Sequence, residues 1–224
     1  MISFNFDSFK FDSPGYLRCT LPGEVVKEVK RSIKKIDSGK IDLEDQRHNL
    51  AGHLQKETSF PVTKKLKYVV EALCYEYDSI FEVEYKDLYH HKFVDEFINR
   101  GYNFKYVLRS LWINYSKKHD FNPIHKHSGV YSFVLWVKIP YKLEDEDKVY
   151  PAVTTSNTSR FSFHYPATNR KNNIGNYEVD ACEWDLIFFP ASLHHSVQPF
   201  YTSDEERISI SGNLFYEPVK VKKK

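Results

Sequence analysis

The stretch FNPIHKHSGVYSFVLWVKIP, residues 121–140, decides the fold and supplies the first candidate ligands. Its second half, Val130–Ile139, is an apolar run of the length and composition typical of a buried strand. His125 and His127 lie just ahead of that run. In extended backbone, residues i and i+2 project from the same face, so both imidazoles can reach one point while Lys126 faces away. The spacing therefore predicts one side of a metal site.

A third histidine is available far downstream, in FFPASLHHSVQPF at residues 188–200. An apolar run, Asp185–Phe189, and a turn at Pro190 predict a strand that leads directly to His194 and His195. Adjacent strand residues point to opposite faces, so only one of the two can be a ligand. Three imidazoles with open positions beside them suit a divalent first-row metal in a catalytic rather than a structural site.

The composition predicts one folded domain, residues 1–224, with no strong signal for nucleic-acid binding. Apolar residues make up 41% of the chain and charged residues 28%, and the net charge is only +2. Three widely spaced cysteines indicate neither a disulfide scaffold nor a cysteine zinc site. No apolar run approaches the roughly 18 residues of a membrane span, and the first residues lack a signal-peptide pattern. We expect a soluble, cytoplasmic protein.

Helical periodicity dominates the first hundred residues, and strand-like runs dominate the rest. Apolar positions from Val25 to Ile36 and from Leu66 to Ile80 predict two helices. The acidic run 143–148 predicts a solvated hairpin tip. Strands are predicted, besides Val130–Ile139, at Tyr106–Ser116, Arg160–Tyr165, Tyr177–Ala181, Asp185–Phe189, Ser196–Tyr201 and Arg207–Phe215.

These elements predict a mainly β protein with flanking helices. We expect a jelly-roll (double-stranded β-helix) core at residues 101–216, because many short strands are separated by Gly, Pro and Asn turns. Residues 1–100 form a helical and mixed support region whose helices pack on one sheet. Residues 217–224 form a basic tail.

Arg207 and Ser209 share one face of the last predicted strand, within ERISISGN at residues 206–213. An arginine that faces a strand-rich core is costly unless it meets an anion. A dicarboxylate cosubstrate would supply one through a bidentate contact. Taken alone, the pattern favours a surface arginine beside Glu205 and Glu206.

Taken in order, the three blocks resemble the iron(II)- and 2-oxoglutarate-dependent dioxygenases. They are most similar to uncharacterised 2-oxoglutarate oxygenases common in bacteriophage genomes, and NLAGHL at residues 49–54 looks like a segment ahead of the catalytic domain in those proteins. The resemblance covers residues 105–216 well. It implies that His125 and His195 ligate Fe(II) and that Arg207, assisted by Ser209, binds the C5 carboxylate of 2-oxoglutarate. Either of two neighbours on the preceding strand, Asn114 or Tyr115, then contacts the cosubstrate.

His127 departs from the family pattern, which has Asp or Glu at this position. Ligation by His127 would make a three-histidine site, in which bound 2-oxoglutarate supplies most of the ligand charge. Without that ligation, the metal would have two histidines and His127 would orient the substrate. The i, i+2 geometry favours ligation.

The resemblance implies an enzyme that hydroxylates a peptide, a nucleobase or a small molecule and releases succinate and CO₂. If the protein is phage-encoded, it acts in the host cytoplasm. One alternative is a cupin-type metalloprotein that does not use 2-oxoglutarate, but it leaves Arg207 and Ser209 unexplained. Another is a non-enzymatic jelly-roll binding or structural module, whose function would survive alanine at His125 or His195.

Overall fold

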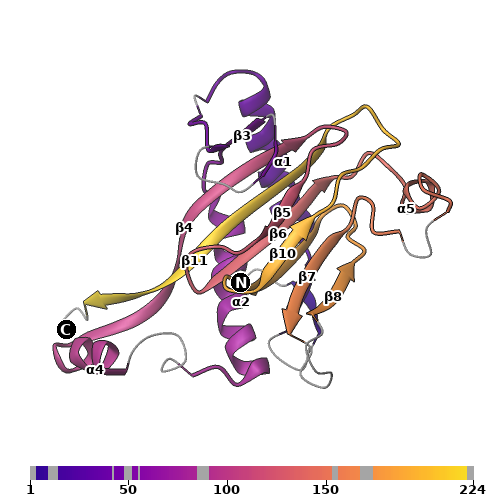
Figure 1. The fold of residues 1–224 in the computed structure, drawn as a ribbon. Helices are drawn as coiled ribbons and strands as arrows, with labels where there is room; N and C mark the ends of the chain where they lie inside the picture. Colours follow the sequence, from indigo (N-terminus) through magenta and orange to yellow (C-terminus); the bar gives the residue numbers. More distant parts are fainter. Residues whose placement is uncertain are drawn as a thin grey trace.

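The computed structural model describes residues 4–9, 15–41, 43–47, 52–54, 56–84, 91–152, 156–166 and 174–220. These residues form two antiparallel sheets that face each other (Figure 1). The large sheet contains, in spatial order, β1 (Asn5–Phe9), β2 (Tyr16–Thr20), β9 (Asp185–Pro190), β6 (Tyr131–Lys138), β11 (Arg207–Lys220), β4 (Tyr102–Ser116) and β3 (Lys56–Ser59). The small sheet contains β5 (Asn122–His125), β10 (His194–Val197), β7 (Phe161–Pro166) and β8 (Ile174–Val179).

From β4 onward the chain alternates between the sheets. It passes from β4 to β5, back to β6, across to β7 and β8, and then through β9, β10 and β11. This alternation defines a double-stranded β-helix. The predicted jelly-roll fold is confirmed. Each strand predicted in this core overlaps an observed one, but the strand predicted at Ser196–Tyr201 shares only Ser196 and Val197 with β10.

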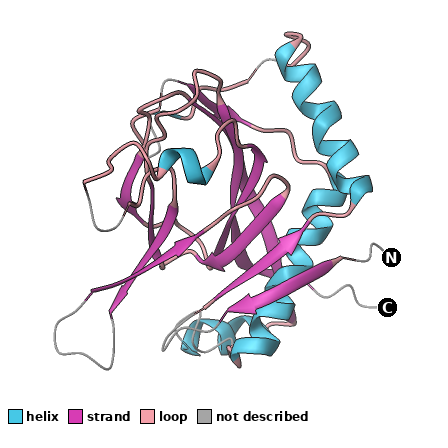
Figure 2. Cartoon of the chain, turned by 90° about the vertical axis from the view of Figure 1, so that its right-hand side faces the viewer, coloured by secondary structure: helices cyan, strands magenta, loops and turns pink. Residues whose placement is uncertain are grey.

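The two long helices cover the outer face of the large sheet, as predicted. Figure 2 shows α1 (Gly23–Asp37) and α2 (Lys64–Phe81) along one side of the strands. Their apolar stripes, which include Val25, Val29, Leu66 and Leu73, are buried in one core with β4 and β6. None of the helices within the described ranges is long and apolar enough to cross a bilayer.

A second core fills the space between the sheets. It contains Val134 and Trp136 from β6 and Phe161 and Phe163 from β7. The intervening residues of β6, such as Leu135, face the helices instead. Because β6 is buried on both faces, its sequence is continuously apolar rather than alternating.

The acidic run is not a solvated hairpin tip, so this prediction is wrong. It contains a short helix, α5 (Leu143–Glu146), and Glu146 is fully buried. The Glu146 carboxylate accepts hydrogen bonds from the backbone N–H groups of Tyr201 and Thr202, at 3.0 and 2.8 Å. Charge-assisted bonds of this kind offset the cost of burying the carboxylate.

The sequence did not predict α4 (His91–Asn99), which packs its Phe97 ring against Tyr102 at the start of β4. The predicted basic tail needs correction. Residues 217–220 are not a tail, because β11 continues to Lys220 in register with Tyr102. Pro218 is tolerated there because β6 pairs with β11 only as far as Leu214, which leaves the second edge of that strand free of ladder bonds. Residues 221–224 lie outside the described part of the chain.

Candidate metal and cosubstrate site

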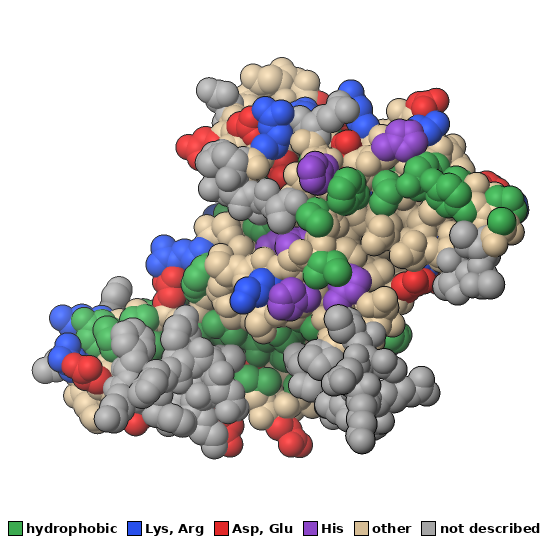
Figure 3. Space-filling model, in the orientation of Figure 1, with side chains coloured by type: hydrophobic (Ala, Val, Ile, Leu, Met, Phe, Trp, Pro, Cys, Tyr) green, Lys and Arg blue, Asp and Glu red, His purple; other side chains and the backbone are tan. Residues whose placement is uncertain are grey.

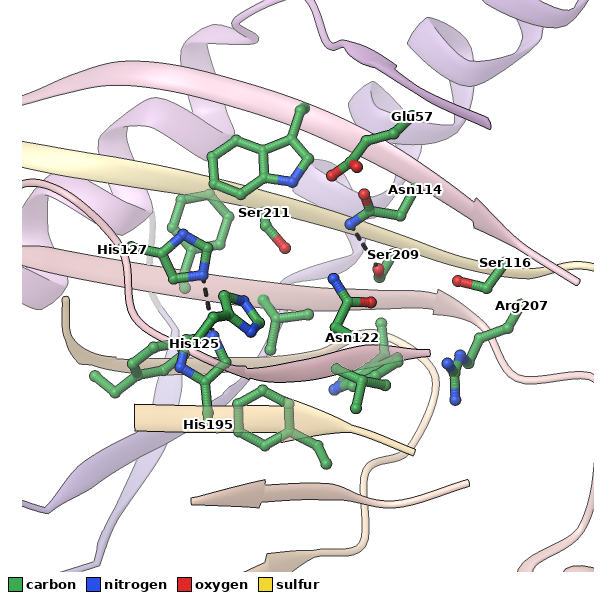
Figure 4. A pocket seen from close by; sticks show the side chains of 17 residues that line it. Glu57, Asn114, Ser116, Asn122, His125, His127, His195, Arg207, Ser209 and Ser211 are labelled. Atoms are coloured by element: carbon green, nitrogen blue, oxygen red, sulfur yellow. Dashed lines mark hydrogen bonds between the residues drawn. The ribbon is translucent and has the colours of Figure 1, made fainter. Parts of the chain in front are cut away.

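A pocket lies between the sheets, with β3, β4, β11 and β6 as its floor (Figure 4). Strand register explains which side chains enter it. Glu57, Asn114, Ser209 and Trp136 are successive cross-strand partners, and all four line the pocket. Ser211 and Arg207 lie on the same face of β11, two residues to either side of Ser209, since strand side chains alternate.

Three histidines close one end of this pocket. His125 ends β5 and is the direct register partner of His195 on β10. His127 lies in the loop after β5, where its backbone N–H donates to the Ala191 carbonyl at 2.9 Å. The ligating nitrogens of the three histidines all lie within 4.8 Å of one another, and the Nε2 atoms of His127 and His195 are 3.0 Å apart. The structure therefore brings together the three residues predicted to bind metal.

Backbone carbonyls fix the orientation of two of these rings. His125 Nδ1 lies 2.7 Å from the Pro123 carbonyl oxygen, and His195 Nδ1 lies 2.9 Å from that of Leu193. A carbonyl oxygen only accepts hydrogen bonds, so Nδ1 carries the proton in both rings. Nε2 is then left with its lone pair directed at the cluster, which is the arrangement that metal-binding histidines usually show.

Burial keeps the three imidazoles electrically neutral. It lowers the pKa of His125, lowers the pKa of His127 to about 3 and places that of His195 well below its usual value. Neutral imidazole nitrogens suit Fe(II). The donor set fits an iron ion.

The opposite end of the pocket holds a buried cation. Arg207 is only 2% exposed. Its Nη1 donates to the Tyr141 hydroxyl and to the carbonyls of Ser159 and Gln198, at 3.2–3.3 Å. Its Nη2 has no hydrogen-bond partner among the described residues, and no carboxylate of those residues pairs with the guanidinium. A buried guanidinium with a free N–H group fits a carboxylate ligand.

Of the two predicted contacts on β4, only Asn114 lines the pocket. Its Nδ2 donates to Ser209 Oγ at 3.2 Å, while its buried Oδ1 has no partner among the described residues. Tyr115 faces the helices instead, with its hydroxyl 3.3 Å from Asp37 Oδ1 and the Lys56 amino group over its ring. The expectation that Tyr115 contacts the cosubstrate is therefore wrong, because adjacent strand residues face opposite ways.

His194 is exposed, on the other face of β10 from His195. Figure 3 shows several histidine side chains at the surface in the orientation of Figure 1.

Sequence reasoning missed Glu57, a pocket residue from the N-terminal region. It is 2% exposed, and burial, together with the nearby Asp45, raises its pKa to about 7. Its strand, KETS, has only four residues. The one available signal was the i, i+2 spacing of Glu57 and Ser59, which places both on one face of a strand.

The segment NLAGHL lies beside the same pocket where it is described. Residues 49–51 fall outside the described ranges. His53 donates its backbone N–H to the Phe121 carbonyl at 2.9 Å and stacks its ring on Phe121. A Cβ atom on Gly52 would come within 2.8 Å of the side chain of Asn122, which lines the pocket. The N-terminal region thus forms part of the pocket wall as well as supporting the sheet.

Comparisons with known proteins point to one family. Residues 110–213, just under half of the chain, match the family described as "Putative 2OG-Fe(II) oxygenase". That segment contains all three histidines together with Asn114, Arg207 and Ser209. No curated protein matches the chain.

Several solved structures are similar in arrangement. A prolyl-4-hydroxylase from Pseudomonas putida has 12% sequence identity and a TM-score of 0.49, with 86% of each chain covered. A 2OG-Fe(II) oxygenase family oxidoreductase from Burkholderia pseudomallei has 15% identity and a TM-score of 0.44, with 88% of this chain and 85% of that chain covered. A viral collagen prolyl hydroxylase from Paramecium Bursaria Chlorella virus-1 has 12% identity and a TM-score of 0.46, with 89% and 94% covered.

The sequence match and the geometry of the pocket agree. The matched segment contains the histidine end and the arginine end, and the residues at each end fit the group that the family uses there. Residues 110–213 are therefore similar to the 2OG-Fe(II) oxygenases, and the residues at the two ends of the pocket fit Fe(II) and 2-oxoglutarate.

Proposed function

We propose that this oxygenase hydroxylates a C–H bond of an organic substrate. One oxygen atom of O₂ enters the substrate as a hydroxyl group, and the other enters 2-oxoglutarate, which leaves as succinate and CO₂. The observation that carries the proposal is the placement, at opposite ends of one pocket, of three neutral imidazoles and a buried guanidinium that has no anion beside it among the described residues.

Each end of the pocket has a separate role in this proposal. His125, His127 and His195 would hold the iron, which together with 2-oxoglutarate supplies the chemistry that activates O₂. Arg207, assisted by Ser209 and oriented by the carbonyls of Ser159 and Gln198, binds the distal carboxylate of the cosubstrate. The aromatic walls, including Trp136 and Phe161, exclude water.

His127 takes the place of the usual carboxylate ligand, which changes the charge of the site. Three neutral imidazoles leave the full positive charge of Fe(II) uncompensated, so the dianionic cosubstrate becomes the main counter-charge. We therefore expect iron and 2-oxoglutarate to strengthen each other's binding.

The two alternatives explain less of the pocket. A cupin-type protein gives no reason for a buried Arg207 with an unpartnered Nη2. A binding module without metal gives no reason for three buried or half-buried imidazoles whose ring nitrogens lie within 4.8 Å of one another. The substrate remains open between a peptide, a nucleobase and a small molecule, and phage origin with a place in the host cytoplasm stays a prediction.

An anaerobic titration tests the proposal. Protein loaded with Fe(II) is titrated with 2-oxoglutarate, and the visible charge-transfer band of the iron chelate is recorded. We expect the band in the wild type, with a midpoint at least tenfold higher in Arg207→Ala and unchanged in Arg109→Ala. Arg109 is an exposed arginine that pairs with Glu217.

Other outcomes would overturn the proposal in distinct ways. Bound iron without the band would favour the cupin-type alternative. Absence of iron binding would favour the non-enzymatic module. If the band forms, mass spectrometry of a hydroxylated product, in one-to-one yield with succinate, tests the hydroxylation itself.

A further inference from the structure

The proposed reaction does not use Glu57, although this carboxylate lines the same pocket. Glu57 lies on the edge strand β3 and is almost completely buried. Figure 4 shows its carboxylate turned into the pocket above Asn114, its partner in the β3–β4 register. Among the described residues, no lysine or arginine forms an ion pair with it.

Glu57 lies to the side of the path that the cosubstrate would take. The path from Arg207 to the histidines follows the pocket face of β11, past Ser209 and Ser211. β3 is the second strand away from β11, with β4 between them, so the lateral separation is about 10 Å at the usual strand spacing. A dianionic cosubstrate has no reason to approach a carboxylate. This flank is therefore left for the substrate.

The charges of the pocket show what such a substrate needs. The two carboxylates of the cosubstrate would be directed at Arg207 and at the iron, and no lysine or arginine of the described residues lies in an ion pair with the buried Glu57 carboxylate. Burial, together with the nearby Asp45, raises the pKa of Glu57 to about 7, and a cation beside the carboxylate would lower it. Trp112 lies two residue pairs further along the β3–β4 ladder; it also lines the pocket, and its indole can bind a cation.

From this arrangement we infer that Glu57 binds a protonated nitrogen group of the substrate, an ammonium or a guanidinium, and so selects basic substrates. This inference rests on the proposed function, since the substrate is the molecule that this site oxidises. Glu57 acts as a specificity-determining residue, and its ion pair with the substrate places a neighbouring C–H bond toward the histidine end.

Matched ligand pairs test the inference by calorimetry. Protein loaded anaerobically with Fe(II) and 2-oxoglutarate is titrated at pH 8 with Nα-acetyl-lysine amide and with its neutral counterpart Nα-acetyl-norleucine amide. A second pair is Nα-acetyl-arginine amide and Nα-acetyl-citrulline amide. We expect at least one cationic member to bind tenfold or more tightly than its neutral partner.

Two variants assign that preference to Glu57. The isosteric change Glu57→Gln removes the negative charge and should abolish the preference. Glu44→Gln, at an exposed carboxylate beside the same strand, should retain it. Equal binding of both members of every pair by the wild type, including no binding, would overturn the inference, as would a preference that survives in Glu57→Gln.

The proposed function is tested separately in the same samples. The charge-transfer band of the iron chelate reports it without any substrate. A protein that forms the band but shows no preference for cations overturns only the role of Glu57. A protein without the band overturns the proposed function itself.

Discussion

The two ends of the pocket use burial in opposite ways. At the histidine end, burial disfavours the charged form, so that three neutral imidazoles lie together without a positive charge among them. At the arginine end, a permanent cation is buried and held by neutral oxygens, with one nitrogen left unpartnered. Each end alone is energetically incomplete. A metal ion bound at the histidine end and a carboxylate bound at the arginine end would supply the missing partners of both groups.

The largest expected effect concerns the histidine end. His195→Ala should weaken Fe(II) binding on the order of 100-fold or more, since loss of groups that merely orient a ligand already costs about 10–100-fold. His194→Ala is the matched control, because this exposed neighbour faces away from the cluster, and it should bind iron normally. Competition with a chromogenic chelator measures both affinities. Equal losses in the two variants would contradict the assignment.

The next effect separates affinity from stability at the arginine end. Arg207→Met should weaken 2-oxoglutarate binding by about 2–5 kcal/mol, the usual cost of truncating a buried charge pair. The same variant should unfold in urea at an equal or higher concentration than the wild type without cosubstrate, because it removes an uncompensated buried charge. Loss of stability in the absence of 2-oxoglutarate would show that Arg207 is a structural residue.

The histidine end should also make the metal-free protein sensitive to acid. The pKa values of the three histidines are lower in the folded state than the ordinary value of about 6.5. The unfolded chain therefore binds more protons, so stability present above pH about 6.5 is lost as the pH falls toward the folded values. Urea unfolding at pH 7.5 and pH 5.5 measures this loss, and bound metal should reduce it. A pH-independent midpoint in the metal-free protein would contradict the prediction.

The smallest effect concerns the floor between the two ends. Ser209→Ala removes a hydroxyl that accepts a hydrogen bond from Asn114, and should weaken 2-oxoglutarate binding by about 1 kcal/mol. Iron affinity should not change. Ser203→Ala is the control, since that hydroxyl accepts a hydrogen bond from the Glu205 backbone outside the pocket. Calorimetric titration with 2-oxoglutarate resolves a difference of this size.

The sequence predicted the parts of the site that depend on local spacing. His125 and His127 are two residues apart, and the apolar run before His195 indicates a strand. These two patterns were enough to predict the three histidines of the metal site. The same spacing of two residues predicted that Arg207 and Ser209 share one face of a strand. The choice between Asn114 and Tyr115 was not, because it depends on which face of β4 meets the small sheet.

Residues whose role depends on distant partners escaped prediction. Glu57 enters the pocket only because the short strand β3 pairs with β4. Glu146 looked like part of a solvated acidic run, yet N–H groups about 55 residues downstream hold its carboxylate in the interior. Both carboxylates are buried by contacts with residues distant in the sequence, and the sequence around each residue does not indicate those contacts.

The direct pairing of His125 with His195 also bears on local motion. β5 is a four-residue edge strand, contains Pro123, which has no N–H group, and is joined to β10 by an irregular register. An ion bound by both histidines fastens this strand to its neighbour. Amide hydrogen exchange in residues 122–127 should therefore slow when metal is added, while β6 in the middle of the large sheet changes little. Bound iron would then hold β5 against β10, and loss of the ion would make β5, which shields the cosubstrate from water, more mobile.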